Sequence, residues 1–335
     1  MRYTALSSLD QTLRISKEYS FRKVSLPVSS EKLTLEGLLC TPKGRSQYYY
    51  AVEHPKKRIL LHFTAGNIRS DLSALTMNNR HVSVPFVLGR DGTIYQLFSS
   101  KFWSGNIGKG IGNTNTGNAE DKVTISIEIS NYGYLTARQD NLETYYSRQK
   151  DAAGKPGPID IYCSLADKEA YQKLNSPFRG QSYYATYTEA QYESLIILLR
   201  YLTAQYNIPR QFLPEPKRYE ATEDVLSFKG IVSHVNYRKD GKWDIGPAFN
   251  WKKVIEGVQA KEFVPTINPL ENLSTKDILL EGIQEVIDSE DQLERFVPEG
   301  KDPKYEDEPY EEIQRNIGEE ENFENEKIKN RIEEK

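Results

Sequence analysis

The chain has 335 residues, a mass of 38.5 kDa and a formal net charge of −4. Its mean hydropathy of −0.66 and its short apolar runs exclude a membrane-spanning protein, while a 38% share of hydrophobic residues suffices for a folded core. Two cysteines, Cys40 and Cys163, exclude a disulfide-rich scaffold and a CxxC metal clip.

Charge divides the chain into two unlike parts. Residues 266–335 carry 22 acidic and 9 basic side chains, a net of −13, which leaves +9 on residues 1–265. A basic body suits an anionic partner such as a cell wall, although it also serves solubility alone. Because its lysines and arginines form no dense run, we expect no nucleic-acid partner. The acidic tail is typical of a solvated segment, with one amphipathic helix predicted at 275–296. Three roles stay open for this tail: shielding the body, binding a protein partner, or none.

Strands and helices alternate along the body. A strand is expected near 32–40, and others are expected at 58–63, 84–88, 94–98, 123–130 and 228–234. Helices are expected at 70–80 and 188–206. Residues 123–130 alternate strictly between apolar and polar side chains, which is typical of a strand with two different faces. The pattern predicts an α/β fold with a central mixed β-sheet flanked by helices.

We divide the chain into an N-terminal extension (1–57), a main domain (58–257) and the acidic tail (258–335). The main domain holds a tyrosine-rich insertion at about 134–186, predicted to be an irregular surface segment. A glycine-rich loop at 103–119 is predicted to be mobile rather than phosphate-binding, since a strand and not a helix follows it.

Two of the four histidines occupy equivalent places. His62 and His234 each lie at the carboxyl end of an apolar strand. One such histidine is usually a core residue, but two at strand ends are typical of metal ligands. Asp244 is the candidate third ligand, although a turn or helix cap explains it equally well. Two imidazoles and one carboxylate leave the fourth position of Zn²⁺ open, as in catalytic zinc sites.

Several segments together resemble the zinc-dependent N-acetylmuramoyl-L-alanine amidases, whose fold is shared by phage amidase-type lysozymes and peptidoglycan-recognition proteins. The resemblance covers about residues 55–257. It rests on LHFTAGN from Leu61, VPFVLGRDGTIYQLF from Val84, FWSGNIG from Phe102, TISIEISNYG from Thr124, YTEAQYESLIILLRYL from Tyr187 and GIVSHVNYRKDGKWDIGPAFNW from Gly230.

The resemblance implies a role for five residues of the reaction centre. His62, His234 and Asp244 would bind zinc, Glu128 would act as the acid and base, and Lys242 would stabilise the developing oxyanion. These roles agree with the chemistry of the side chains, since a carboxylate can move a proton and an ammonium can stabilise negative charge. Taken alone, Glu128 is more typical of an exposed strand carboxylate than of a catalytic residue, and Lys242 is much more typical of a solvated turn.

The resemblance also implies substrate contacts from Asn67, Trp103 and Asn106. Asn106 stands where relatives often carry a histidine. Its amide can form hydrogen bonds but cannot carry a proton at pH 7.

The implied activity is hydrolysis of the amide bond between N-acetylmuramic acid and the L-alanine of peptidoglycan or a muropeptide, by zinc-activated water. The alternative is a peptidoglycan-binding module without catalysis, which would typically lack a zinc ligand. The first residues show no apolar signal segment, so we expect cytoplasmic synthesis, with delivery to the cell wall by a non-classical route. A recycling enzyme, an endolysin and a delivered effector all fit.

Overall fold

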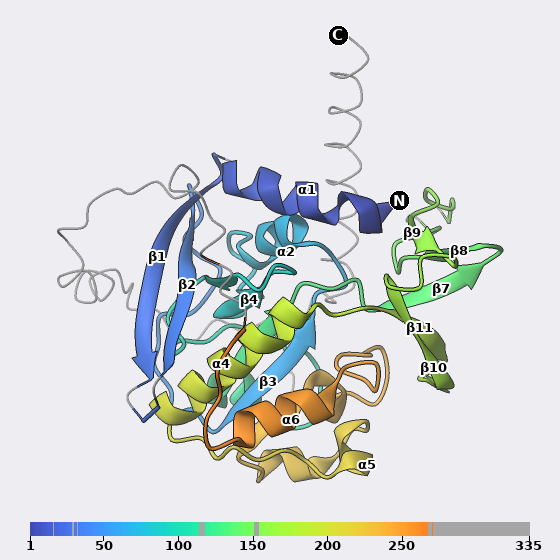
Figure 1. Ribbon diagram of the computed structural model, residues 1–335. Coiled ribbons are helices and arrows are strands. Elements are labelled where there is room, and N and C mark those ends of the chain that lie inside the picture. Colours follow the sequence, from blue (N-terminus) through green and yellow to red (C-terminus); the bar gives the residue numbers. More distant parts are fainter. Residues whose placement is uncertain are drawn as a thin grey trace.

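The computed structural model describes residues 1–15, 17–28, 30–31, 33–113, 118–150, 154–266 and 270. In this part of the chain a seven-stranded sheet has the order β1-β2-β5-β4-β6-β3-β12, and a five-stranded sheet has the order β10-β11-β7-β8-β9 (Figure 1). The predicted α/β fold with a central mixed sheet and flanking helices is confirmed.

The seven-stranded sheet mixes parallel and antiparallel pairs. Its strands are β1 (Tyr19–Val28), β2 (Leu33–Pro42), β3 (Arg58–Phe63), β4 (Phe86–Leu88), β5 (Ile94–Gln96), β6 (Thr124–Ile129) and β12 (Gly230–Ser233). The neighbours β4, β6, β3 and β12 run parallel, whereas β1 with β2 and β4 with β5 form antiparallel pairs. Parallel strands bring their carboxyl ends to one edge, which is where ligand sites form in open α/β sheets.

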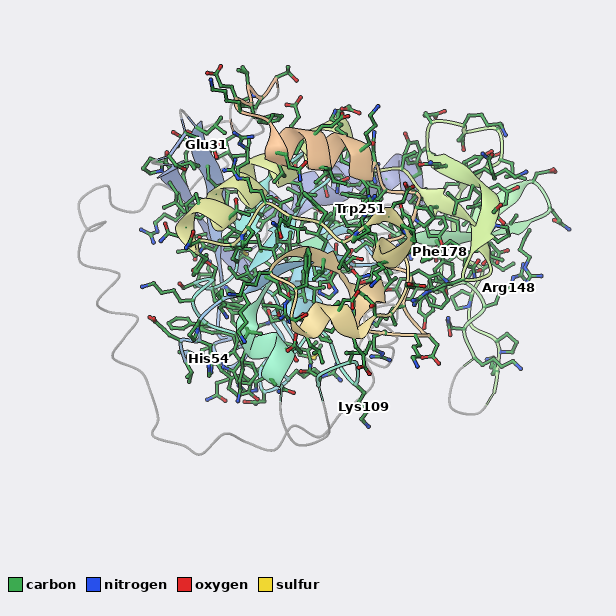
Figure 2. The ribbon with its side chains drawn as sticks, turned by 90° about the horizontal axis from the view of Figure 1, so that it is seen from below. Glu31, His54, Lys109, Arg148, Phe178 and Trp251 are labelled. Carbon is green, nitrogen blue, oxygen red and sulfur yellow. The ribbon has the colours of Figure 1, made fainter. Side chains whose placement is uncertain are left out.

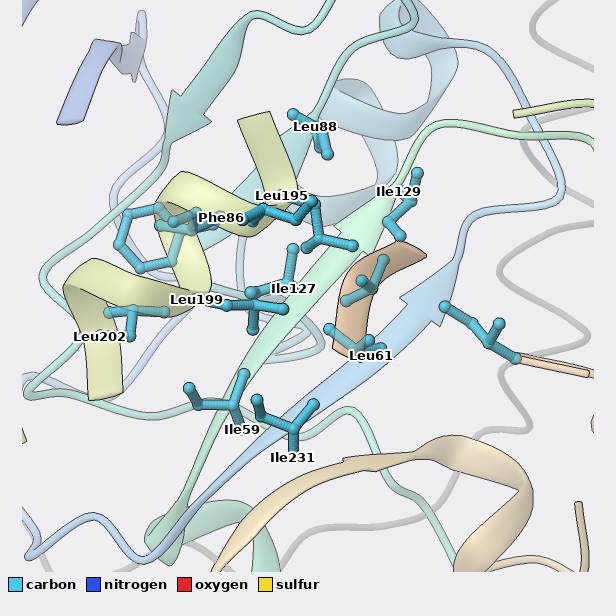
Figure 3. Close-up of a cluster of buried hydrophobic side chains, with 14 of the residues drawn as sticks. Ile59, Leu61, Phe86, Leu88, Ile127, Ile129, Leu195, Leu199, Leu202 and Ile231 are labelled. Atoms are coloured by element: carbon cyan, nitrogen blue, oxygen red, sulfur yellow. The ribbon is translucent and has the colours of Figure 1, made fainter. Parts of the chain in front are cut away.

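Strand β6 shows how the sequence pattern builds the core. Ile125, Ile127 and Ile129 point to one face and pack with the leucines of α4 (Glu189–Gln205) (Figure 3). The second helix of this cluster, α6 (Trp251–Gln259), packs beside α4. Fully burying one such isoleucine contributes about 1.5–3 kcal/mol.

The polar face of β6 is also buried, and its hydroxyl side chains are hydrogen-bonded. Ser126 donates to the Asn106 side chain at 2.7 Å, and Ser130, just past the strand, donates to Asp71 at 2.6 Å. Helices α1 (Arg2–Ile15) and α2 (Ile68–Leu75) contribute to a separate apolar cluster that includes Val87 of β4. Because Val87 pairs with Glu128, this cluster lies on the face to which Glu128 points.

Two strands from the first 57 residues, β1 and β2, are part of the sheet. Strand β2 confirms the predicted strand near 32–40, and it joins the sheet through a parallel pairing with β5. Glu31, between β1 and β2, forms ion pairs with Arg200 of α4 and with Arg210. The extension therefore supplies one edge of the central sheet.

The insertion is a sheet, and the expectation of an irregular segment is wrong. Its antiparallel strands are β7 (Tyr134–Arg138), β8 (Asn141–Glu143), β9 (Ile161–Ser164), β10 (Tyr171–Phe178) and β11 (Gln181–Ala185). Leu135, Leu142 and Tyr162 are buried in its own apolar cluster, which Leu6 of α1 completes. Most of these strands are too short to show a clear alternation of hydrophobic residues.

The remaining short elements are α3 (Ala119–Val123), α5 (Glu215–Arg218), η1 (Glu223–Leu226) and η2 (His234–Asn236). None of the helices described combines the length and the apolar character that crossing a membrane requires. Both cysteines are buried free thiols. The predicted helix at 275–296 and nearly all of the acidic tail lie outside the described residues.

Candidate metal centre

Strand register brings the two predicted histidine ligands together. His62 is the fifth residue of β3, and Leu61 pairs with Ser233, the last residue of β12. His234 follows at once and begins the short 3-10 helix η2. Both imidazoles therefore leave neighbouring strands at the same end.

The three predicted ligands meet in a buried cluster. The Nδ1 atoms of His62 and His234 are 2.9 Å apart, and Asp244 Oδ2 lies 3.1 Å from the first and 2.9 Å from the second. The three residues are only 1%, 1% and 5% exposed. Ligand atoms bound tetrahedrally at the usual zinc distances lie about 3.3 Å from one another, so this spacing suits a zinc ion. Within the described residues, no second group of three or more potential metal ligands has this arrangement.

The hydrogen bond of His234 shows which of its ring nitrogens carries the proton and which offers a lone pair to the cluster. Its Nε2 lies 3.0 Å from the Ile107 carbonyl, which can only accept, so Nε2 carries the proton. Burial lowers the pKa of His234 to about 4, although Asp244 opposes that shift. The ring is therefore neutral near pH 7, and its Nδ1 is available to a metal ion. A histidine ligand whose other nitrogen donates to a carbonyl is the usual arrangement in metal sites.

The electrostatics of the cluster favour a positive charge at its centre. Burial alone would lower the pKa of His62, but Glu128 and Asp244 together raise it. Burial would raise the pKa of the Asp244 carboxyl, but His234 and His62 hold it well below its usual value. A divalent cation supplies the positive charge that these carboxylates favour, so the donor set fits zinc.

The two predicted catalytic side chains adjoin the cluster. Glu128 pairs with His62 across β6 and β3, so both side chains point to the same face from strands about 4.8 Å apart. Lys242 precedes Asp244 by two residues, and its charge opposes protonation of both histidines. Glu128 is 1% and Lys242 7% exposed. The structure thus brings all five predicted residues of the reaction centre together.

Two of the three predicted substrate contacts, Asn67 and Trp103, are buried and contact other residues of the protein. Asn67 is 1% exposed and caps α2, since its side-chain oxygen accepts from the backbone N–H groups of Arg69 and Ser70. Trp103 is buried and stacks on Tyr50 at 4.3 Å between ring centroids. Their substrate contacts stay predictions.

Asn106 belongs to a loop that supports the metal centre. Its backbone N–H and that of Ile107 donate to Asp121 Oδ1 at 2.9 and 3.0 Å, and the Ile107 carbonyl holds His234. Sequence reasoning missed Asp121 and the Ile107 carbonyl. A backbone oxygen leaves no mark in a sequence. The residues around Asp121 form no motif that identifies its partners, which are backbone N–H groups.

Comparison with known proteins gives the family. The family described as N-acetylmuramoyl-L-alanine amidase matches residues 53–247, more than half of the chain. No curated protein matches the sequence.

Three similar solved structures have low sequence identity and low TM-scores. AmiD from E. coli, bound to the substrate anhydro-N-acetylmuramic acid-L-Ala-D-gamma-Glu-L-Lys, is 20% identical over 72% of this chain and 66% of its own, with a TM-score of 0.36. An AmpD derivative is 16% identical over 64% of this chain and 92% of its own, with a TM-score of 0.36. AMPDH3 from Pseudomonas aeruginosa, in complex with anhydromuramic pentapeptide, is 14% identical over 64% of each chain, with a TM-score of 0.35. The matches thus span just under two thirds of AmiD and AMPDH3. The family assignment rests on the sequence match over residues 53–247: the chain belongs to the N-acetylmuramoyl-L-alanine amidase family.

Proposed function

We propose that this protein is a zinc-dependent hydrolase of peptidoglycan or muropeptides that cleaves the amide bond between N-acetylmuramic acid and L-alanine. The observation that carries the proposal is the convergence of His62 Nδ1, His234 Nδ1 and Asp244 Oδ2 beside Glu128, in a chain of the amidase family. All three ligands are present, which favours catalysis over a binding module that has lost its metal.

Each side chain has a distinct part in this reaction. A zinc ion held by the three ligands would supply a Lewis acid that activates water and polarises the amide carbonyl. Glu128 accepts the proton of the attacking water and passes it to the leaving nitrogen. The Lys242 ammonium stabilises the negative charge that develops on the carbonyl oxygen, and its burial strengthens that effect. No covalent bond to the protein is needed.

Mass spectrometry of products from defined muropeptides tests the bond and the substrate together. The zinc-loaded protein should release the stem peptide with a free L-alanine amine. Glu128→Gln should bind zinc but cleave about 10²–10⁴-fold more slowly, since the amide cannot carry the proton. Glu189→Gln, an exposed carboxylate on α4, is the matched control and should cleave at the parent rate.

Two results would contradict this assignment. If Glu128→Gln cleaves as fast as the parent, Glu128 is not the acid and base. If the zinc-loaded parent is retained on cell-wall sacculi but releases no product, the protein is a binding module instead.

A further inference from the structure

The tip of the insertion has an unusual residue in its turn. Phe178 at the end of β10 pairs with Gln181 at the start of β11, so Arg179 and Gly180 form a two-residue hairpin turn. Both have positive φ, +46° for Arg179 and +81° for Gly180. Such turns favour Asn-Gly, because left-handed backbone brings the Cβ of an ordinary residue too close to the following carbonyl oxygen. Arginine at this position is therefore not explained by the turn itself.

The Arg179 side chain reaches across to the metal-ligand loops. Its Nη1 donates to the Lys242 carbonyl at 2.6 Å, and its Nη2 donates to the carbonyls of Arg238 at 2.9 Å and Val235 at 3.3 Å. Val235 follows His234 directly, and its N–H donates to the Asp244 carbonyl at 2.8 Å. The Arg179 guanidinium thus connects the segment after His234 with the segment before Asp244.

The backbone and neighbour of Arg179 fix the same loop from both sides of Asp244. The Arg179 carbonyl accepts from the Trp243 indole N–H at 3.0 Å. The ring of Phe178 packs so closely on Gly246 that a Cβ there would lie 2.7 Å from it. Figure 2 shows Phe178 on the part of the insertion nearer the body, and Arg148 farther out.

We propose that Arg179 is a positioning residue for the metal centre: it holds the backbone of the His234 and Asp244 segments so that their ligand atoms converge. The inference rests on the zinc site of the proposed function, but not on the bond that is cleaved. Ordering a loop residue costs conformational entropy, so a loop that is already fixed binds metal more tightly than one ordered only on binding. The planar fork of arginine can reach three carbonyls together, which the single ammonium of lysine matches poorly.

Arg179→Asn separates this role from ordinary stability. Asparagine suits the left-handed turn at least as well as arginine, so the hairpin should persist while the guanidinium is lost. Arg148→Asn is the matched control, because Arg148 also has positive φ (+60°), lies in the insertion, and pairs with Glu143 at 3.0 Å. Zinc dissociation constants of the full-length proteins are measured by chelator competition, together with the Co²⁺ absorption spectrum and the melting temperature without metal.

We expect Arg179→Asn to raise the zinc dissociation constant tenfold or more and to change the Co²⁺ spectrum, with a melting temperature close to that of Arg148→Asn. Arg148→Asn should bind zinc as the parent does. If Arg179→Asn fails to fold, Arg179→Lys takes its place and should also bind zinc more weakly.

Two results overturn the inference. One is parent-like zinc affinity in the Arg179 variant. The other is a loss of affinity that only accompanies a large drop in the metal-free melting temperature, which would mark a general structural role. Failure of the proposed function is distinct, since it is seen as a parent protein that binds zinc but releases no product.

Discussion

Asp121 is a buried carboxylate whose protonation should contribute to the pH dependence of stability. It is 2% exposed, accepts from the backbone of Asn106 and Ile107, and accepts from the Asn113 side-chain amide at 2.5 Å. The Ile107 carbonyl in turn holds His234, so Asp121 anchors the loop that orients a metal ligand.

The size of the effect follows from the pKa of Asp121. Burial raises it from 3.8 to about 6, although the hydrogen bonds to the Ile107 and Asn106 backbone oppose the shift. Between these two pH values the folded state holds more protons than the unfolded state, so the free energy of unfolding falls as pH rises. The contribution of Asp121 is fully present below pH 3.8 and is lost as pH passes 6. A difference of about two pKa units corresponds to about 3 kcal/mol.

Urea unfolding of the metal-free parent and of Asp121→Asn, at several pH values from 4 to 7, measures this contribution. The asparagine does not titrate. Subtracting the free energy of unfolding of the parent from that of the variant cancels the pH dependence of the groups that both proteins share. The free energy of unfolding of the variant minus that of the parent should therefore rise by about 2.5 kcal/mol from pH 4 to pH 7, since part of the full contribution is already lost at pH 4. The constant offset between the proteins carries no information, because it reflects the altered hydrogen bonds. The exposed Asp140→Asn is the control. A difference for Asp121→Asn that stays level or falls with pH would refute the reasoning.

Three further predictions concern metal and packing. Zinc at one hundred times its dissociation constant should stabilise the parent by about 2.7 kcal/mol in thermal unfolding, and this gain should vanish in His234→Ala. Ile127→Ala should lower the free energy of unfolding by about 2–5 kcal/mol in urea, and a cost below 1 kcal/mol would contradict its place in the core. Gly133→Ala should destabilise much more than Gly44→Ala. Both glycines have positive φ, but a Cβ at Gly133 would lie 2.1 Å from the Phe63 ring, whereas nothing lies within 4 Å at Gly44. Equal melting temperatures would count against that explanation.

The central sheet was predictable because its strands carry strong periodic signals. The alternation of residues 123–130 gives β6, and the apolar run at 58–63 gives β3, since burial of one or both faces shapes those sequences directly. The insertion has no such signal. Strand β10 has mostly exposed or half-buried side chains, and β8 and β9 have only a few residues each. Their pairing depends on contacts with partners elsewhere in the insertion, which a pattern along one segment does not contain.

The reaction centre was predictable to a similar degree. His62 and His234 were found because polar residues at the ends of apolar strands stand out, and parallel strands bring such ends together. The supports of the ligands were not found. The Ile107 carbonyl is a backbone atom, and Arg179 lies 63 positions before Lys242. An arginine before a glycine is a common dipeptide, and only the fold shows that its guanidinium reaches the loop of Asp244.

The charges of the buried centre favour a bound cation and a fixed position for its candidate ligands. Glu128 and Asp244 bring two carboxylates into a site that is almost fully buried, and Lys242 offsets only one of them. Buried charge is stable when it is paired or bound to a metal ion, so the surplus negative charge favours a divalent cation. Without metal, the same surplus draws a proton to His62, whose pKa it raises. Metal and proton therefore compete for one place, and zinc should bind more weakly as pH falls. Without metal, the Asp244 carboxylate could also turn away from the centre. The hydrogen bonds of Arg179 to the backbone before Asp244 oppose that movement by fixing the loop.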